Sequence, residues 1–240
     1  MPYTSCRAHP GLFIYYGAGE LRTLAEYERV VLQPGHYTQA EVAELTAAGT
    51  QALAYLSIGE DTGPPAPWHL EQRNPVWGGH YVDAWHEGWR GHLREATAGA
   101  LAKGFTGLML DTLETPPLLR EGMGALPSLV AMLREAVGSG FILANRAHQV
   151  LGAVHDVDAF LFEAFSTTWE DGYRALRGRE LLDNAARLSQ LRALGKPVYA
   201  LDYSNRKGLT DFAVSRGFNL GLEVQVSNRD VTCLPGSARR

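Results

Sequence analysis

The chain has 240 residues, of which 45% are hydrophobic and 20% are charged. This balance is typical of a soluble globular protein with a substantial core, and it excludes a disordered or fibrous chain. The formal net charge of −4 argues against broad electrostatic binding to nucleic acid or to an anionic membrane. The sequence has no apolar run long enough for a signal peptide or a membrane span. As written it therefore predicts a cytoplasmic protein, whereas a chain trimmed of a leader would be secreted.

Short apolar runs rich in β-branched and aromatic residues recur along the chain. They predict eight strands, which begin at Leu12, Arg29, Ala52, Gly107, Phe141, Ala159, Val198 and Leu220. Helical periodicity lies between these runs, at residues 21–27, 39–48, 87–103, 117–137, 146–154, 170–194 and 209–216. Alternating strands and helices predict a parallel sheet. Eight repeats predict an α/β fold that closes into a (β/α)8 TIM barrel.

Residues 1–240 are predicted to form a single domain, because the sequence contains no linker, internal repeat or low-complexity segment. An open doubly wound sheet is the alternative fold. It would need a glycine-rich dinucleotide turn after an early strand, and the Gly17-Ala18-Gly19-Glu20 segment lacks the third glycine. No full helix follows the eighth strand, so the last helix of the barrel is expected to be incomplete. We expect a monomer.

A long proline- and tryptophan-rich insert lies between the third and fourth predicted strands. It carries four of the five tryptophans of the chain: Trp68, Trp77, Trp85 and Trp89. Loops that follow barrel strands lie on the face where barrel enzymes place their sites. Because indole faces stack on the C–H faces of sugars, the insert suggests a carbohydrate-binding wall. An accessory core that holds the insert in place is an equally good interpretation for any single tryptophan.

Two carboxylates end predicted strands after several apolar residues. Asp111 ends the fourth strand and Glu163 ends the sixth, so both are expected at the mouth of the barrel. A pair of acids, one a nucleophile and one a general acid, is the minimum equipment for glycoside cleavage. A single strand-end acid would more often cap a helix or pair with a basic side chain. The two together, beside an aromatic insert, favour catalysis.

Other polar and aromatic residues are expected around this pair. They are the strand-end or near-strand residues Tyr16, Glu60, Asp83, Trp85, Asn145, Asp202, Tyr203 and Gln225. Gln225 is included because alternation along the eighth strand places it on the face opposite Leu222, Val224 and Val226. Such a ring of hydrogen-bonding groups suits sugar hydroxyls or an amine. Any one of these residues is equally able to satisfy loop backbone groups instead.

With these residues in place, the sequence resembles the endo-α-1,4-polygalactosaminidase family, glycoside hydrolase family 114. The matching segments are AYLSIGE at the third strand, VDAW, GFTGLMLDT at the fourth, FEAF at the sixth and LDYS at the seventh. The resemblance implies a TIM barrel that cleaves α-1,4-linked galactosamine polymers, with Asp111 as nucleophile and Glu163 as acid/base. It also implies that Glu60, Asp202 and Tyr203 line the sugar subsite. The sequence departs from the family pattern at Arg146, where an arginine is unexpected.

Other classes of enzyme fit less well. A metal-dependent amidohydrolase would want a His-x-His pair after the first strand, and none of the eight histidines forms one. A phosphate-binding barrel would want glycine-rich turns after the last two strands, which the sequence lacks. No metal or cofactor is therefore expected. A carbohydrate-binding barrel without catalysis, a transglycosylase, and a hydrolase for a different α-linked glycan remain open.

The two cysteines, Cys6 and Cys233, do not form a Cys-x-x-Cys motif, so a zinc or redox site of that type is excluded. They flank the first and last predicted strands, which are neighbours in a closed barrel. A disulfide between them is geometrically possible, although two separate thiols are slightly favoured.

Overall fold

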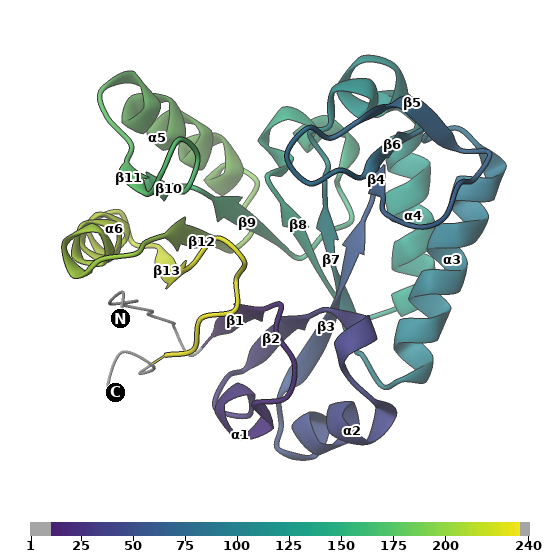
Figure 1. The fold of residues 1–240 in the computed structure, drawn as a ribbon, viewed down its shortest axis with the longest axis horizontal. Coiled ribbons are helices and arrows are strands. Elements are labelled where there is room, and N and C mark those ends of the chain that lie inside the picture. The colour runs from purple at the N-terminus through teal and green to yellow at the C-terminus, as the bar shows by residue number, and fades with distance from the viewer. Residues whose placement is uncertain (1–10, 236–240) are drawn as a thin grey trace.

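The computed structural model describes residues 11–235, and its centre is an eight-stranded parallel sheet (Figure 1). Its strands are β1 (Leu12–Tyr15), β2 (Arg29–Leu32), β3 (Gln51–Ser57), β7 (Gly107–Asp111), β8 (Phe141–Asn145), β9 (Ala159–Glu163), β12 (Val198–Tyr203) and β13 (Glu223–Ser227). They lie side by side in chain order. All eight predicted strands are present, and the prediction of a TIM-type barrel is confirmed.

The closure of the barrel differs from its other strand junctions. Among the described residues, no backbone ladder joins β13 to β1. Instead, the side chain of Gln225 hydrogen-bonds to both backbone groups of Ile14. Its Oε1 accepts from the Ile14 N–H at 2.7 Å, and its Nε2 donates to the Ile14 carbonyl at 2.7 Å. A primary amide has the same donor and acceptor as a peptide group, so one side chain replaces a rung of the missing ladder.

Helices cover the outside of the sheet (Figure 1). They are α1 (Leu21–Leu24), α2 (Gln39–Ala47), α3 (Glu87–Ala102), α4 (Leu126–Val137), α5 (Arg179–Arg192) and α6 (Lys207–Asn219). In the part of the chain that the structure describes, no helix follows β13, as expected from the sequence. No described helix has both the length and the apolar character needed to cross a membrane.

Three of the predicted helices differ from the structure. Residues 146–154 form only the two 3-10 turns η4 (Ala147–Gln149) and η5 (Leu151–Ala153). The helix predicted at 170–194 begins only at Arg179, because the residues before it form the turn and second strand of an antiparallel hairpin of β10 (Thr167–Thr168) and β11 (Arg174–Ala175). Gly172 and Gly178 there have φ values of 88° and 46°, which a helix does not allow. The helix predicted at 117–137 begins with the π turn η2 (Leu118–Gly122) and the 3-10 turn η3 (Met123–Ala125).

The strands separate two apolar cores. Leu12, Ile14, Leu53, Met109, Leu143, Leu161 and Leu201 belong to a small cluster inside the barrel. Residues of opposite parity, such as Phe13, Leu108 and Phe160, pack between the strands and the helices. Because side chains alternate along a strand, parity decides which side chains reach the barrel interior.

The insert forms a small antiparallel sheet of its own. Its strands are β4 (Glu60–Asp61), β5 (His69–Arg73) and β6 (His80–Val82), in the order β4-β6-β5. Trp89, at the start of α3, is only 1% exposed, and its Nε1 donates to the Ile58 carbonyl at 3.0 Å. Trp89 is therefore part of an accessory core that holds the insert in place. Trp77 and Trp85, by contrast, are 54% and 58% exposed and are not core residues.

The 3-10 turn η1 (Pro34–His36) completes the regular elements. Cys233 takes part in a disulfide bond, so the expectation of two separate thiols is wrong. Cys6 lies outside the described residues.

Candidate active site

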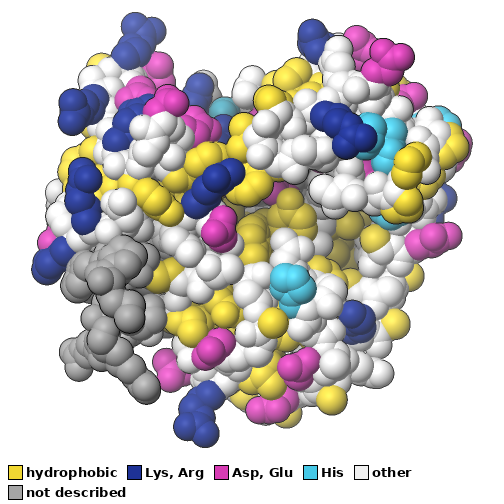
Figure 2. All heavy atoms as spheres, viewed as in Figure 1, with side chains coloured by type: hydrophobic (Ala, Val, Ile, Leu, Met, Phe, Trp, Pro, Cys, Tyr) yellow, Lys and Arg dark blue, Asp and Glu magenta, His cyan; other side chains and the backbone are white. Residues whose placement is uncertain are grey.

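A cavity of about 700 Å³ opens at the carboxyl ends of the barrel strands. Its volume lies within the roughly 300–1,000 Å³ of small-molecule sites. Barrel strands, the insert, the β9–α5 connection and the segment after β13 all contribute to its lining. Figure 2 shows the surface hollowed between the insert and the β10–β11 region.

A chain of hydrogen bonds crosses the floor of this cavity. Tyr55 Oη donates to Asp111 Oδ2 at 2.8 Å. Asn145 Nδ2 then donates to both acids, to Asp111 Oδ1 at 2.7 Å and to Glu163 Oε2 at 2.8 Å. Tyr203 Oη donates to the other oxygen of Glu163. These side chains come from β3, β7, β8, β9 and β12, which are consecutive neighbours in the sheet, so the network follows the strand order.

Strand parity explains why these five side chains meet. Each lies two residues after an apolar residue of the inner core and therefore points into the barrel. The inner-core residues are Leu53, Met109, Leu143, Leu161 and Leu201. Each of the five lies near the carboxyl end of its strand, where the inner face opens into the cavity.

The backbone turns sharply directly after three of these residues. Thr112, Arg146 and Ala164 follow Asp111, Asn145 and Glu163, and they have φ values of 60°, 50° and 53°. Left-handed conformations are uncommon for residues other than glycine and cost roughly 1–2 kcal/mol. The same strained turn thus ends three adjacent strands at the site, where such strain is characteristic of function.

Thr112 also docks the insert onto β7. Its Oγ1 accepts from the N–H groups of Ile58 at 3.0 Å and Gly59 at 2.8 Å. A Cβ atom on Gly59 would lie 2.4 Å from the Thr112 carbonyl oxygen, so only glycine allows this approach. The docking fixes the position of Glu60, the next residue, relative to Asp111.

The hydrogen bonds of Asn145 limit the distance between the two acids. The separation of Asp111 Oδ1 and Glu163 Oε2 cannot exceed the 2.7 and 2.8 Å distances taken together. The orientation of the amide follows from chemistry, because a carbonyl oxygen between two carboxylates would be repelled. Within the described residues, Asn145 Oδ1 is buried without a hydrogen-bond partner.

The tyrosines of the cavity are held as hydrogen-bond donors. Burial, together with the charges of Asp111 and Glu163, raises the pKa of Tyr16 and of Tyr203 well above the ordinary value. Tyr16 packs edge-on against Tyr55, with ring centroids 5.3 Å apart. Neutral phenols next to two acids stabilise the carboxylates without adding charge.

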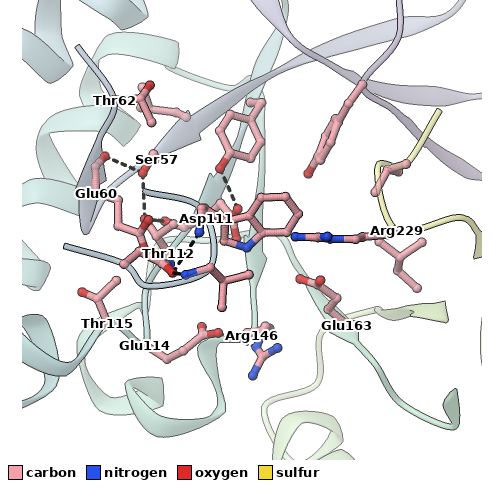
Figure 3. A pocket seen from close by; sticks show the side chains of 18 of the residues that line it. Ser57, Glu60, Thr62, Asp111, Thr112, Glu114, Thr115, Arg146, Glu163 and Arg229 are labelled. Carbon is pink, nitrogen blue, oxygen red and sulfur yellow. Dashed lines mark hydrogen bonds and ion pairs between the residues drawn. The ribbon is translucent and has the colours of Figure 1, made fainter. Parts of the chain in front are cut away.

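Glu60 and Glu114 are two of the five further acids that line the cavity. Glu60 is 9% exposed, and its Oε1 accepts from Asn74 Nδ2 at 2.8 Å. Burial raises the pKa of Glu60. Burial also raises the pKa of Glu114 to about 8, although the Arg146 guanidinium, which forms an ion pair with it, works in the opposite direction. Figure 3 shows Glu114 and Arg146 on the same side of the pocket.

Aromatic rings and a cation meet at the rim. Trp77 and Trp169 have ring centroids 5.5 Å apart. The Arg229 guanidinium lies 4.6 Å from the Trp77 ring and 4.5 Å from the Trp169 ring. All three residues line the cavity.

The structure brings together some of the residues expected from the sequence. Tyr16, Glu60, Asp111, Glu163 and Tyr203 line the cavity. Asn145 lies directly beneath it, hydrogen-bonded to both acids. Tyr55, Glu114, Trp169 and Arg229 also line the cavity but were not expected from the sequence, and Arg146 was noted only as a departure from the family pattern. Tyr55 alone carried a usable signal, since it shares the parity of Leu53 on β3.

The other four expected residues lie outside the cavity lining. Asp202 has the parity of Ala200, which packs in the outer core. It is fully buried, and its Oδ1 accepts from the N–H groups of Ser166 at 2.7 Å and Thr167 at 2.8 Å. Burial raises the pKa of Asp202 to about 6. Its role in the structure is to hold the turn after β9.

Gln225 points into the barrel, as alternation predicted, but both of its polar atoms are used in the junction with β1. Asp83 Oδ1 accepts from the Trp85 N–H at 2.9 Å in a tight turn. The Trp85 Nε1 donates to the Glu121 carbonyl at 2.9 Å. Among the described residues, no group of three or more His, Cys, Asp or Glu side chains is arranged to hold a metal ion.

A (β/α)8 barrel that carries carboxylates at the ends of β7 and β9, bridged by an asparagine from β8 between them, has the arrangement expected of a glycoside hydrolase site. The chain matches the family described as glycoside-hydrolase family GH114 over residues 28–232, and it belongs to this family. It is thus a glycosidase with a carbohydrate substrate.

Solved structures agree with this assignment. The glycoside hydrolase domain of PelA from Pseudomonas aeruginosa is 28% identical, with a TM-score of 0.84 over 95% of this chain and 98% of that one. Ega3 of Aspergillus fumigatus, solved in complex with galactosamine, has a TM-score of 0.72 over 92% and 91% of the two chains. At 15% identity it supports the fold alone. An uncharacterised protein of Deinococcus radiodurans is 26% identical, over 90% of this chain and 78% of that protein.

Proposed function

We propose that the chain is an endo-acting, retaining hydrolase of α-1,4-linked galactosamine polymers. The observation that carries the mechanism is the bridge from Asn145 to both acids. It keeps the two bridged oxygens within the ~5–5.5 Å spacing typical of retaining glycosidases, and below the ~6.5–9.5 Å of inverting ones. This spacing favours a retaining mechanism over an inverting one.

In this mechanism the Asp111 carboxylate attacks the anomeric carbon while Glu163 gives its proton to the departing glycosidic oxygen. The glycosidic bond breaks and a glycosyl ester forms on Asp111. Water then attacks the ester, Glu163 takes the proton of that water, and Asp111 is released as a carboxylate. Tyr55 and Asn145 donate hydrogen bonds to the two oxygens of Asp111 and so hold its carboxyl group in position.

The charge of the cavity supports a cationic sugar. Seven carboxyl groups line it: Glu60, Asp61, Asp111, Glu114, Glu163, Glu170 and Asp230. Without Glu114, whose pKa is raised to about 8, and the proton donor Glu163, five of them face the two guanidinium groups of Arg146 and Arg229. Such a lining attracts the ammonium group of a deacetylated amino sugar. The complex of the structurally similar Ega3 with galactosamine is consistent with this choice. Tyr16, Glu60, Asn145 and Tyr203 are proposed as substrate contacts, because they surround the acid pair.

The test is turnover of a soluble, partly acetylated α-1,4-galactosamine oligomer, followed by mass spectrometry. Wild type is expected to give internal cleavage, and Glu163→Gln to lose it by about 10²–10⁴-fold. No cleavage by wild type would refute the proposed substrate, and full activity of Glu163→Gln would refute the acid pair.

An aryl α-glycoside of the same oligomer separates the two roles. Its leaving group needs no proton, so Glu163→Gln should still release the aryl group in a first turnover, whereas Asp111→Asn should not. The reverse result would exchange the roles of nucleophile and acid. Proton NMR of the first-formed product checks that the α configuration is retained.

A further inference from the structure

We propose that Trp77 and Trp169 form a second sugar-binding subsite at the mouth of the cavity, and that Arg229 occupies it until a sugar unit displaces the guanidinium. This inference rests on the proposed function for the identity of the sugar. It concerns residues that the acid pair does not use.

The subsite is assembled from three separate segments. Trp77 belongs to the turn between β5 and β6 of the insert, Trp169 directly follows β10, and Arg229 follows β13. The two indole rings meet at an interplanar angle of 69°. In Figure 3 the Arg229 side chain reaches into the middle of the pocket, on the same side as Glu163. The rings therefore bring opposite sides of the cavity mouth into contact.

The position of the rings relative to the acids suggests one sugar unit of spacing. Trp169 packs edge-on against Tyr203, with centroids 6.5 Å apart, and Tyr203 Oη donates to Glu163. A sugar on the indoles is thus adjacent to the glycosidic bond that Glu163 would protonate.

Arg229 is held in a way that permits displacement. In the part of the chain that the structure describes, its guanidinium makes no hydrogen bond or ion pair and lies against the two rings. The residue is exposed, and cation–π contacts are weak at exposed positions. Its backbone N–H donates to Tyr173 Oη at 2.8 Å, so the main chain can stay in place while the side chain leaves.

The chemistry of the stack matches an amino sugar. Indole faces pack against the C–H face of a pyranose ring, and the same faces attract a cation. An ammonium group on the incoming sugar can therefore replace the guanidinium that it displaces. Glu170 and Asp230, both on the cavity lining and each next to one member of the stack, add negative charge there.

Calorimetric binding to the inactive Glu163→Gln chain tests this inference, with galactosamine and an α-1,4-galactosamine hexasaccharide as probes. Adding Trp77→Ala or Trp169→Ala should weaken hexasaccharide binding by about tenfold and leave the monosaccharide unchanged. Trp85→Ala is the matched control, because Trp85 is an exposed tryptophan near the same insert but lies outside the cavity lining. Arg229→Ala should tighten hexasaccharide binding by about threefold, since nothing then has to be displaced.

The inference is overturned if both tryptophan variants bind the hexasaccharide like Trp85→Ala, or if Arg229→Ala weakens binding. Trp77→Phe and Trp169→Phe keep an aromatic face and should recover part of the affinity, which keeps the test valid if an alanine variant folds poorly. Turnover by wild type separates this inference from the proposed function. Cleavage with unchanged affinities refutes only the subsite, whereas ring-dependent binding without cleavage refutes only the hydrolase.

Discussion

Two parts of the barrel wall use strand-end side chains for opposite purposes. From β3 to β12, backbone ladders already join every strand, and the side chains Tyr55, Asn145 and Tyr203 are left to hydrogen-bond two acids. Between β13 and β1 the described residues form no ladder, and the side-chain amide of Gln225 hydrogen-bonds to the backbone of Ile14 instead. A side chain on the inner face is thus available for chemistry only where the neighbouring backbone N–H and C=O groups are already hydrogen-bonded to each other.

Asn145 and Gln225 make the comparison sharp, because both are buried carboxamides that bridge two partners. Asn145→Ala removes a donor shared by both acids and should lower kcat by about 10²–10³-fold. The effect of this substitution on the melting temperature should be small, since the side-chain oxygen Oδ1 of Asn145 already lacks a hydrogen-bond partner among the described residues. Steady-state kinetics and thermal unfolding check both statements. A stability loss with kcat unchanged would contradict the assignment of this region to catalysis.

Gln225→Leu is expected to act in the opposite way. It leaves a buried N–H and a buried carbonyl of Ile14 without partners, which should lower the free energy of unfolding by about 2–3 kcal/mol. Activity per folded molecule should stay close to wild type. Denaturant unfolding and active-site-normalised turnover are the measurements. Unchanged stability would mean that Gln225 does not hold the junction.

Asp202 and Tyr203 extend the comparison to adjacent residues of one strand. Burial raises the pKa of Asp202 from 3.8 to about 6, so the folded state retains a proton that the unfolded state releases. The stability of wild type should therefore fall as pH rises from about 4 to about 6, and stay lowered above that. Asp202→Asn removes the ionisation and should be about 3 kcal/mol more stable than wild type at pH 8 and equal to it below pH 4. Unfolding curves across this range check the sign, and loss of activity would instead place Asp202 at the sugar.

The smallest effect is expected at the turn after Glu163. Ala164→Gly relieves a left-handed alanine and should raise the free energy of unfolding by about 0.5–1 kcal/mol, after allowing for the greater freedom of glycine in the unfolded chain. Ala159→Gly, at the first residue of β9, where the backbone is extended, is the control and should destabilise. Equal effects of the two substitutions on the melting temperature would argue that Ala164 is not strained.

The fold was predictable because each barrel strand is a short apolar run that ends at a polar residue. The acids followed from the same pattern, since Asp111 and Glu163 end such runs. The alternation of side chains along a strand also predicts that Asp202 points away from the cavity and that Tyr55 points toward it. It could not separate Gln225 from a substrate contact, because a missing ladder next to β1 is a long-range property.

The rim could not be derived in this way. Trp169 and Arg229 lie on connections whose course depends on turns such as those at Gly172 and Gly178, not on periodicity. These turns also replaced the start of the helix predicted at 170–194. The contact of Arg229 with two indoles joins residues that are far apart in the chain, so local sequence patterns do not predict it.

The docking of Thr112 onto the insert has a mechanical consequence. Since Thr112 Oγ1 accepts from two N–H groups of the β3–β4 turn, the base of the insert and the strand that carries Asp111 behave as one rigid body. A hinge at that base would shift Asp111, the proposed nucleophile, relative to Glu163. If the proposed polymer is the substrate, its admission would fall to side-chain rotation at the rim, where rearrangement is fast and leaves the acid spacing intact.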